Sequence, residues 1–130
     1  MAGGLTNGES DRLVNASLGI TAYTAPTTPM KLALATSASS ASAAGTEVIG
    51  GSYARQTITL ATPASGGTGV ASTAATTYTN MPTTTTTYGD IYDSNGSPRR
   101  AYWAPLGASK ATNLGDTLTF PTGSITVDLD

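Results

Sequence analysis

The sequence predicts an all-β protein: an antiparallel β-sandwich, jelly-roll or immunoglobulin-like, with one short N-terminal helix. Three observations lead to this prediction. Thr, Val and Ile recur in alternating runs, which favour strands with one buried face. Turn signals rich in Gly, Pro, Asn and Ser separate these runs at short intervals. A helical spacing of apolar residues occurs only near the N-terminus. Short strands at this spacing are typical of sandwiches and barrels rather than of parallel α/β sheets.

The composition indicates an ordered domain with a modest core. The 130 residues suffice for one domain, yet only 11% are charged, against roughly 25% in average soluble domains. Disorder usually combines high net charge with few β-branched residues, whereas this chain has a net charge of -2 and many threonines. A core poor in large apolar side chains gains stability by burying surface against other copies or a partner.

Residues 1–21 are predicted to form an N-terminal arm and short helix, followed by a single β-sandwich domain over residues 22–130. The helix is expected over Leu5–Leu18. Thr6 as N-cap and Glu9 three residues later would form a capping box, and Gly19 would end the helix. The residues predicted to form its apolar side are Leu13, Ala16 and Ile20, with Val14 and Leu18 beside them.

The next segments alternate between extended chain and loop. Residues 22–29 are predicted to be an extended linker because of their two prolines. Met30–Thr36 is predicted to be a strand that buries the side carrying Met30, Leu32 and Leu34. Residues 37–44 are almost entirely Ser and Ala, so we expect a mobile loop without anchoring residues.

Residues 53–62 are predicted to form the central strand of the sheet. Alternation places Tyr53 and Arg55 on one face with two threonines, and Ile58 and Leu60 on the other face. Pro63 would end this strand, and a flexible turn over residues 64–69 would lead to an antiparallel partner at residues 70–79.

The C-terminal half is predicted to hold a further hairpin and two short strands. Pro82 makes residues 80–87, with their run of five threonines, an edge strand or a loop. The hairpin joins a strand at residues 88–92 to one at residues 99–106 through the turn Asp93-Ser94-Asn95-Gly96. The remaining predictions are a loop at 107–115, a strand at 116–120 with Leu118 and Phe120 inward, a turn at 121–123 and a strand at 124–129.

The residue types present exclude several chemistries. Without histidine or cysteine, a Ser-His-Asp or Cys-His site and a histidine or thiolate zinc site cannot form. Asp90 and Asp93 lie three residues apart on a predicted strand, so their carboxylates point to opposite faces. No basic patch favours nucleic acid, no apolar run is long enough to span a membrane, and no secretory signal is recognisable. We therefore expect no enzymatic activity, no cofactor and no bound metal.

Two glycine-containing turns resemble ligand-binding loops. Gly66-Gly67-Thr68-Gly69 lacks the lysine of a P-loop, which favours a hairpin turn. The turn at residues 93–96 resembles part of a calcium loop, but the remaining ligands of such a loop are missing, which favours a plain turn.

Five residues are candidates for an interface: Tyr53, Arg55, Tyr92, Tyr102 and Trp103. Arg55 could bind a ligand carboxylate, although an arginine on a strand more often pairs with an acid or lies at an oligomer interface. The aromatic residues are more often core or subunit interface than a platform for sugars. Arg99 and Arg100 follow a turn and are predicted to be a solvated hairpin tip.

Several stretches resemble a known family. They are Met1–Asn7, the "TEV-GG-YAR" pattern of Thr46–Gln56, Ile91-Tyr92-Asp93 before its turn, and the "GDTLTFP-G" pattern within Gly115–Val127. Together they resemble a family of small structural proteins of tailed bacteriophages, labelled tail fibre, minor tail or head decoration proteins. The resemblance implies a structural protein located in the virion and assembled in the host bacterial cytoplasm.

The preferred hypothesis is a capsid decoration or cement protein. It would act as a homo-oligomer, with a trimer as one possibility, and contact the major capsid protein or other virion proteins. The alternative is a tail fibre or tail-tip module that binds a host surface glycan through Tyr92, Tyr102 and Trp103. A depolymerase would require two close carboxylates in a cleft, and the eight acidic residues show no such pattern.

Overall fold

The computed structural model describes residues 4–61 and 69–128. It confirms a mostly β, antiparallel fold with one short helix. The elements follow in the order β1 (Gly4–Leu5), α1 (Asn7–Ser17), β2 (Lys31–Ala35), β3 (Gln56–Thr57), β4 (Leu60–Ala61), β5 (Gly69–Ser72), β6 (Thr76–Met81), β7 (Thr84–Tyr92), β8 (Arg100–Thr112), β9 (Asp116–Phe120) and β10 (Thr126–Asp128).

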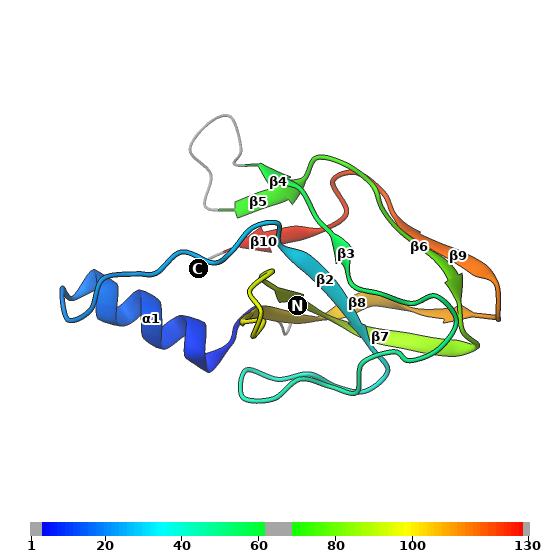
Figure 1. Ribbon diagram of the computed structural model, residues 1–130, viewed down its shortest axis with the longest axis horizontal. Coiled ribbons are helices and arrows are strands. Elements are labelled where there is room, and N and C mark those ends of the chain that lie inside the picture. Colours follow the sequence, from blue (N-terminus) through cyan, green and yellow to red (C-terminus); the bar gives the residue numbers. More distant parts are fainter. Residues whose placement is uncertain (1–3, 62–68, 129–130) are drawn as a thin grey trace.

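The strands form a sandwich-like arrangement of antiparallel sheets (Figure 1). The largest sheet has the strand order β1-β8-β7-β2-β3, and the smaller sheets have the orders β10-β5-β4 and β6-β9. The core lies between them: Leu34 and Ile91 come from the five-stranded sheet, whereas Tyr78 and Leu118 come from the β6-β9 pair. The Tyr78 hydroxyl donates a hydrogen bond of 2.6 Å to the backbone oxygen of Leu32, which joins the two layers at the centre.

The predicted cap of the helix is confirmed, but only half of the capping box forms. The Thr6 hydroxyl accepts a hydrogen bond of 3.3 Å from the backbone N–H of Glu9. The Glu9 side chain does not return to Thr6, because it points into the body of the protein, and the Thr6 N–H donates to Ala101 instead. Gly19, with φ of 70°, follows the end of the helix as expected.

The predicted apolar side of the helix is wrong in part. Val14, Leu18 and Ile20 are 54%, 68% and 67% exposed. Among the helix residues Asn7–Ser17, only Glu9 is buried. The helix therefore attaches to the sheet through a charged side chain rather than through an apolar stripe.

The Ser/Ala segment after β2 is anchored, so the prediction of a loop without anchoring residues is wrong. Ser39 is 3% exposed and donates a hydrogen bond of 2.7 Å to the carboxylate of Asp90. The guanidinium of Arg100 donates to the Ser40 carbonyl at 2.7 Å. These two bonds hold the segment against β7 and β8.

The predicted central strand is also wrong. Among the described residues of this range, 53–61, only β3 and β4 form; β3 lies at the edge of the five-stranded sheet, and β4 belongs to a different sheet. The central positions are taken by β7 and by β2, whose Leu34 is completely buried. Strand β2 was predicted correctly, because its alternating leucines can fill the core on one side.

The hairpin that links this region to the following strand is confirmed at its base. Leu60 pairs with Ser72 and Ala61 pairs with Ala71, whereas the predicted turn lies almost entirely outside the described residues. The partner predicted as one strand at residues 70–79 is divided between β5 and β6, which belong to different sheets.

The threonine run is a strand rather than a loop. Strand β7 begins at Thr84 and pairs there with β8 on one side only, as in the predicted edge strand, whereas from Tyr88 onward it lies between β2 and β8. Thr86 is completely buried. The predicted loop at residues 107–115 is wrong, because β8 continues to Thr112 and pairs with the start of β7. Pro82 remains between β6 and β7, where it interrupts no ladder.

The β7–β8 hairpin is confirmed, with Ile91 opposite Tyr102. Its turn is held by Asp93, whose carboxylate accepts hydrogen bonds from the backbone N–H groups of Arg99 at 2.8 Å, Thr27 at 3.1 Å and Asn95 at 3.2 Å. Burial alone would raise the pKa of Asp93, but these bonds lower it below its usual value. The ionised carboxylate of Asp93 therefore stabilises the turn.

The last two strands agree with the sequence. In β9, Leu118 is 9% exposed and Phe120 packs against the core. In β10, Val127 packs against the core, and residue 129 of the predicted strand lies outside the described residues. Within the described part of the chain, the helix is too short and polar to cross a membrane.

Candidate functional site

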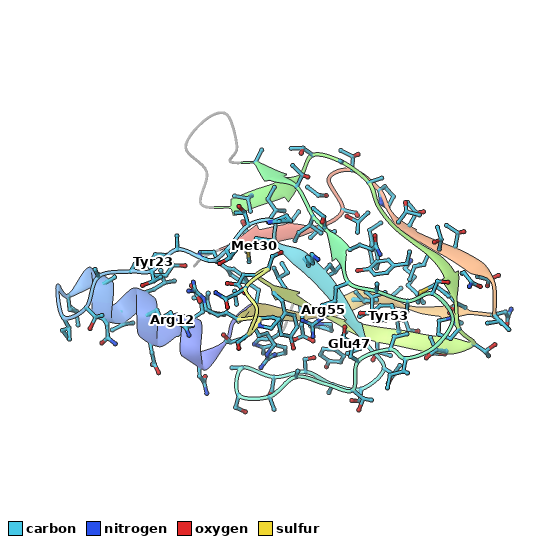
Figure 2. The ribbon with its side chains drawn as sticks, viewed as in Figure 1. Arg12, Tyr23, Met30, Glu47, Tyr53 and Arg55 are labelled. Atoms are coloured by element: carbon cyan, nitrogen blue, oxygen red, sulfur yellow. The ribbon has the colours of Figure 1, made fainter. Side chains whose placement is uncertain are left out.

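Three of the five interface candidates lie close to Glu47: Tyr53 and Arg55, labelled with Glu47 in Figure 2, and Tyr92. Arg55 donates two hydrogen bonds to the Glu47 carboxylate, from Nε at 2.9 Å and from Nη2 at 2.8 Å. The Tyr53 hydroxyl donates to the same carboxylate at 2.8 Å. The Arg55 guanidinium lies over the ring of Tyr92, 3.8 Å from its centroid. We call Glu47, Tyr53, Arg55 and Tyr92 the Glu47 cluster.

The Glu47 cluster closes the free edge of β2. The Tyr53 hydroxyl accepts a hydrogen bond of 2.9 Å from the backbone N–H of Leu34, a donor that would otherwise lack a strand partner. Burial raises the pKa of Glu47, but the bonds from Arg55 and Tyr53 outweigh it and lower that pKa. The "TEV-GG-YAR" pattern thus supplies a glutamate, together with a tyrosine and an arginine that hydrogen-bond to it and stabilise this part of the chain.

The two glycines of this pattern allow the chain to turn between Glu47 and Tyr53. Gly50 and Gly51 have φ of 113° and 56°, a conformation that favours glycine. A Cβ atom on Gly51 would lie 2.2 Å from the backbone oxygen of Asn80. Another residue at this position would therefore force the turn away from β6 and misplace the phenol of Tyr53.

Tyr102 and Trp103 do not join the Glu47 cluster or each other. As neighbours on β8 they point to opposite faces, with Trp103 opposite Asp90 and Tyr102 opposite Ile91. Trp103 stacks on Tyr88, with ring centroids 6.5 Å apart and an interplanar angle of 16°. Tyr92, Tyr102 and Trp103 therefore do not present one common platform to a sugar.

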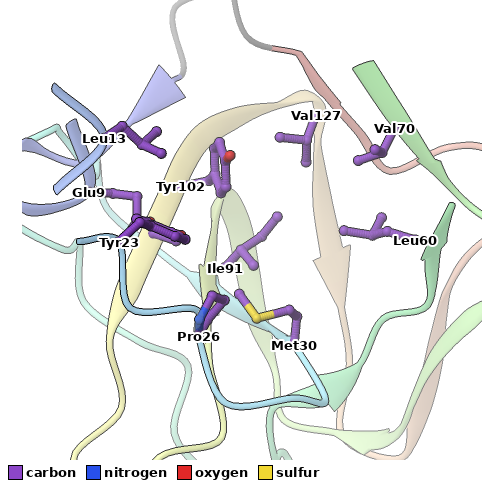
Figure 3. A pocket seen from close by; sticks show the side chains of 11 residues that line it. Glu9, Leu13, Tyr23, Pro26, Met30, Leu60, Val70, Ile91, Tyr102 and Val127 are labelled. Atoms are coloured by element: carbon purple, nitrogen blue, oxygen red, sulfur yellow. The ribbon is translucent and has the colours of Figure 1, made fainter. Parts of the chain in front are cut away.

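Tyr102 instead lines an apolar pocket at the end of the sandwich beside α1 (Figure 3). The pocket has a volume of about 270 Å³. Its wall includes Leu13, Met30, Ile91, Tyr102 and Val127. Glu9 and Tyr23 border the pocket on the side of the helix, and their polar groups lie at that border.

The buried side chain of Glu9 is the centre of a second cluster. Its carboxylate lies 3.0 Å from Nε of Arg99, accepts a hydrogen bond of 3.1 Å from Nη2 of Arg99, and accepts a short one from the Tyr23 hydroxyl. Arg99 also donates to the Thr24 carbonyl at 2.9 Å. We call Glu9, Tyr23 and Arg99 the Glu9 cluster. It ties the helix, the linker and the β7–β8 hairpin together.

Sequence reasoning missed the Glu9 cluster. Glu9 was assigned to the cap and Arg99 to a solvated tip, yet their side chains are only 3% and 14% exposed. The Arg100 side chain is only 12% exposed, and it pairs with Asp90 at 2.8 Å. Glu9 and Arg99 lie 90 residues apart, so no local pattern marks that pair. Asp90 and Arg100 are only 10 residues apart, across the predicted hairpin.

Four acidic side chains of the described residues are held by ion pairs or by backbone hydrogen bonds. Glu9, Glu47 and Asp90 each face an arginine, and Asp93 faces backbone donors. No group of three potential metal ligands occurs among residues 4–61 and 69–128. The fold and the clusters together define a small all-β protein that is braced by buried and half-buried ion pairs.

A comparison with protein families assigns the chain to one of them. The family described as Podophage GP4 fiber I protein gp80 matches residues 4–128. The chain belongs to this family and is therefore a structural protein of a phage virion that associates with other virion proteins. No curated protein matches the sequence.

Proposed function

We propose that this protein is a subunit of a phage fibre and that it acts through contacts rather than through catalysis. The observation that carries the proposal is the match of the fibre family across residues 4–128, nearly the whole chain. The structure supports it physically. A fibre subunit needs a sheet scaffold that resists deformation, and the Glu9 and Glu47 clusters brace this one at two places.

Capsid decoration, the role that the sequence favoured, is the competing assignment. Both roles require a stable scaffold with a repeated contact, so the fold alone does not separate them. The family description names a fibre and makes this role the better supported one.

The location of the protein in intact particles tests the proposal. Particles carrying a small epitope tag on this chain would be labelled with gold-conjugated antibody, and untagged particles would serve as control. We expect label at fibres and a copy number, from quantitative mass spectrometry, far below that of the major capsid protein. Label spread evenly over the head, with a copy number near that of the capsid protein, would establish decoration and overturn the fibre role.

A further inference from the structure

The chain contains two Asn-Gly pairs, and the fold places them in different backbone settings. Asn95-Gly96 lies in the turn between β7 and β8, whereas Asn7-Gly8 forms the first two residues of α1. All four residues are exposed. Access of water is therefore similar at the two pairs, and the conformation of the backbone distinguishes them.

An asparagine followed by glycine can react with its own backbone, because glycine has no side chain to hinder the approach. The glycine nitrogen attacks Cγ of the asparagine, so that a bond from N to Cγ forms. The bond from Cγ to Nδ2 breaks, and ammonia leaves with the proton of the glycine N–H. The five-membered succinimide then takes up one water. Cleavage of one or the other ring C–N bond gives aspartate or isoaspartate, and no oxidant or reductant is needed.

In the β7–β8 turn the reacting groups are available. Within the described part of the chain, the backbone N–H of Gly96 has no hydrogen-bond acceptor. The Oδ1 atom of Asn95 accepts a hydrogen bond of 3.1 Å from the backbone N–H of Ser97. This bond folds the side-chain amide back along the chain and stabilises negative charge on Oδ1 as the attack proceeds. The surroundings of Gly96 are open, because a Cβ atom there would meet nothing within 4 Å.

In the helix the same ring is prevented from closing. The ring contains Cα, Cβ, Cγ and the carbonyl carbon of the asparagine, so its closure fixes the backbone dihedral ψ. In α1 this dihedral is set by the helical hydrogen bonds. The first turn is also anchored, because the Asn7 N–H donates to the Ala41 carbonyl at 2.9 Å and the Thr6 hydroxyl accepts from Glu9. Ring closure at Asn7 therefore requires this turn to open first.

We propose that Asn95 is a site of spontaneous deamidation in the folded protein and that the helix protects Asn7 from it. Deamidation adds one negative charge to a net charge of -2, and isoaspartate also adds a methylene group to the main chain. The new carboxylate lies two residues from that of Asp93, which holds the turn through backbone N–H groups. Because like charges at this spacing repel each other, the modified turn is less stable.

The turn transmits this change to the attachment of the helix. The backbone N–H of Ser94 donates to the Thr27 carbonyl at 2.8 Å, and Arg99 at the other end of the turn reaches Glu9 at 3.0 Å. A loosened turn therefore weakens contacts with both the linker and α1. Proteins of an assembled virion are not replaced, so the modification accumulates with the age of the particle. The reaction itself requires only the fold and does not depend on the proposed fibre role.

Peptide mass spectrometry of the full chain, incubated at mildly alkaline pH, tests the proposal. Deamidation exchanges NH2 for OH, and electron-transfer fragmentation distinguishes isoaspartate from aspartate. We expect conversion at Asn95 to be at least about tenfold faster than at Asn7, because a helical turn must open before Asn7 reacts. In urea the two rates should become similar. Equal rates in the folded protein, or conversion at Asn95 only in urea, would overturn the proposal.

A glycine substitution tests whether the reaction passes through the ring. Gly96→Ala should slow conversion at Asn95 severalfold, because its methyl group hinders the attack. Gly107→Ala is the matched control and should leave the rate unchanged. Both variants should fold, since neither glycine has a positive φ and a Cβ at either meets nothing within 4 Å. An unchanged rate in Gly96→Ala, or aspartate as the exclusive product, would show direct hydrolysis by water and overturn the succinimide route.

Discussion

The Glu9 and Glu47 clusters use the same three residue types in different settings. In each, a glutamate faces an arginine and accepts a hydrogen bond from a tyrosine hydroxyl. The glutamate and arginine are 90 residues apart in the Glu9 cluster and 8 residues apart in the Glu47 cluster. The glutamate side chain is 3% exposed in the first and 34% exposed in the second. The same kind of ion pair therefore joins elements distant in the sequence in the Glu9 cluster, and it closes a local turn in the Glu47 cluster.

The difference shows where an ion pair matters for stability. Water competes with the half-exposed pair, so its removal costs little. In the buried pair, removal of one partner leaves a charge without compensation in a medium of low dielectric constant. The Glu9 cluster should therefore dominate the attachment of the helix, whereas the Glu47 cluster refines a local conformation.

The largest expected effect comes from Glu9→Ala. We expect the free energy of unfolding to fall by about 3 kcal/mol, because Arg99 would keep a buried charge without its acid. Urea unfolding followed by circular dichroism would measure it. Asp11→Ala, at an exposed acid on the same helix, is the control and should change stability by less than about 0.5 kcal/mol. Equal effects would show that the helix is not held by the Glu9 cluster.

A double-mutant cycle sharpens the comparison. The coupling energy between Glu9 and Arg99, from the variants Glu9→Gln, Arg99→Met and the pair together, should reach about 2 kcal/mol. The corresponding cycle for Glu47 and Arg55 should give about 0.5 kcal/mol, because that pair is partly solvated. Similar coupling energies in the two cycles would remove the distinction between buried and exposed clusters.

Acid should release the Glu47 cluster gradually. Because the folded state lowers the pKa of Glu47, its contribution is present above the unfolded value of about 4.3 and is lost as the pH falls through the folded pKa. Glu47→Gln should therefore cost about 1 kcal/mol at pH 7 and less at pH 3. Urea midpoints at the two pH values would measure the change, and a cost independent of pH would rule out the ionised carboxylate as its source.

The smallest expected effect is a change in stability at high pH. Burial, followed by the bond to Glu9, raises the pKa of Tyr23 to about 12. Its contribution is complete below the unfolded pKa of about 10 and is lost as the pH rises toward the folded value. Tyr23→Phe should therefore reduce the loss of stability between about pH 9 and pH 11. If both proteins lose stability in parallel, ionisation of Tyr23 is not linked to unfolding.

Much of the fold followed from local patterns. The cap at Thr6, the helix end before Gly19, the leucines of β2 and the hairpin that pairs Ile91 with Tyr102 are all set by neighbouring residues. The predictions were wrong where pairing with strands distant in the sequence determines the structure. Thr84 to Thr86 form a strand rather than a loop because Lys110 to Thr112 continue the ladder beside them, and neither segment shows this alone.

The candidate site divides in the same way. The sequence singled out Tyr53, Arg55 and Tyr92, and the structure brings them together around Glu47. It also proposed Tyr102 and Trp103 as companions, but the pleat of β8 sends them to opposite faces. The pairing of Glu9 with Arg99 was absent from the sequence predictions.

By itself, the sequence determined the antiparallel β class, the capped helix, the hairpin turns and the motif that contains Glu47, Tyr53 and Arg55. These depend on residue spacing and turn chemistry within about ten positions. Only the tertiary structure decided which strands are central, which charges are buried and which side of the helix stays exposed. Those properties depend on partners many tens of residues away, brought close by burial of the common core, and a short window of sequence holds no record of them.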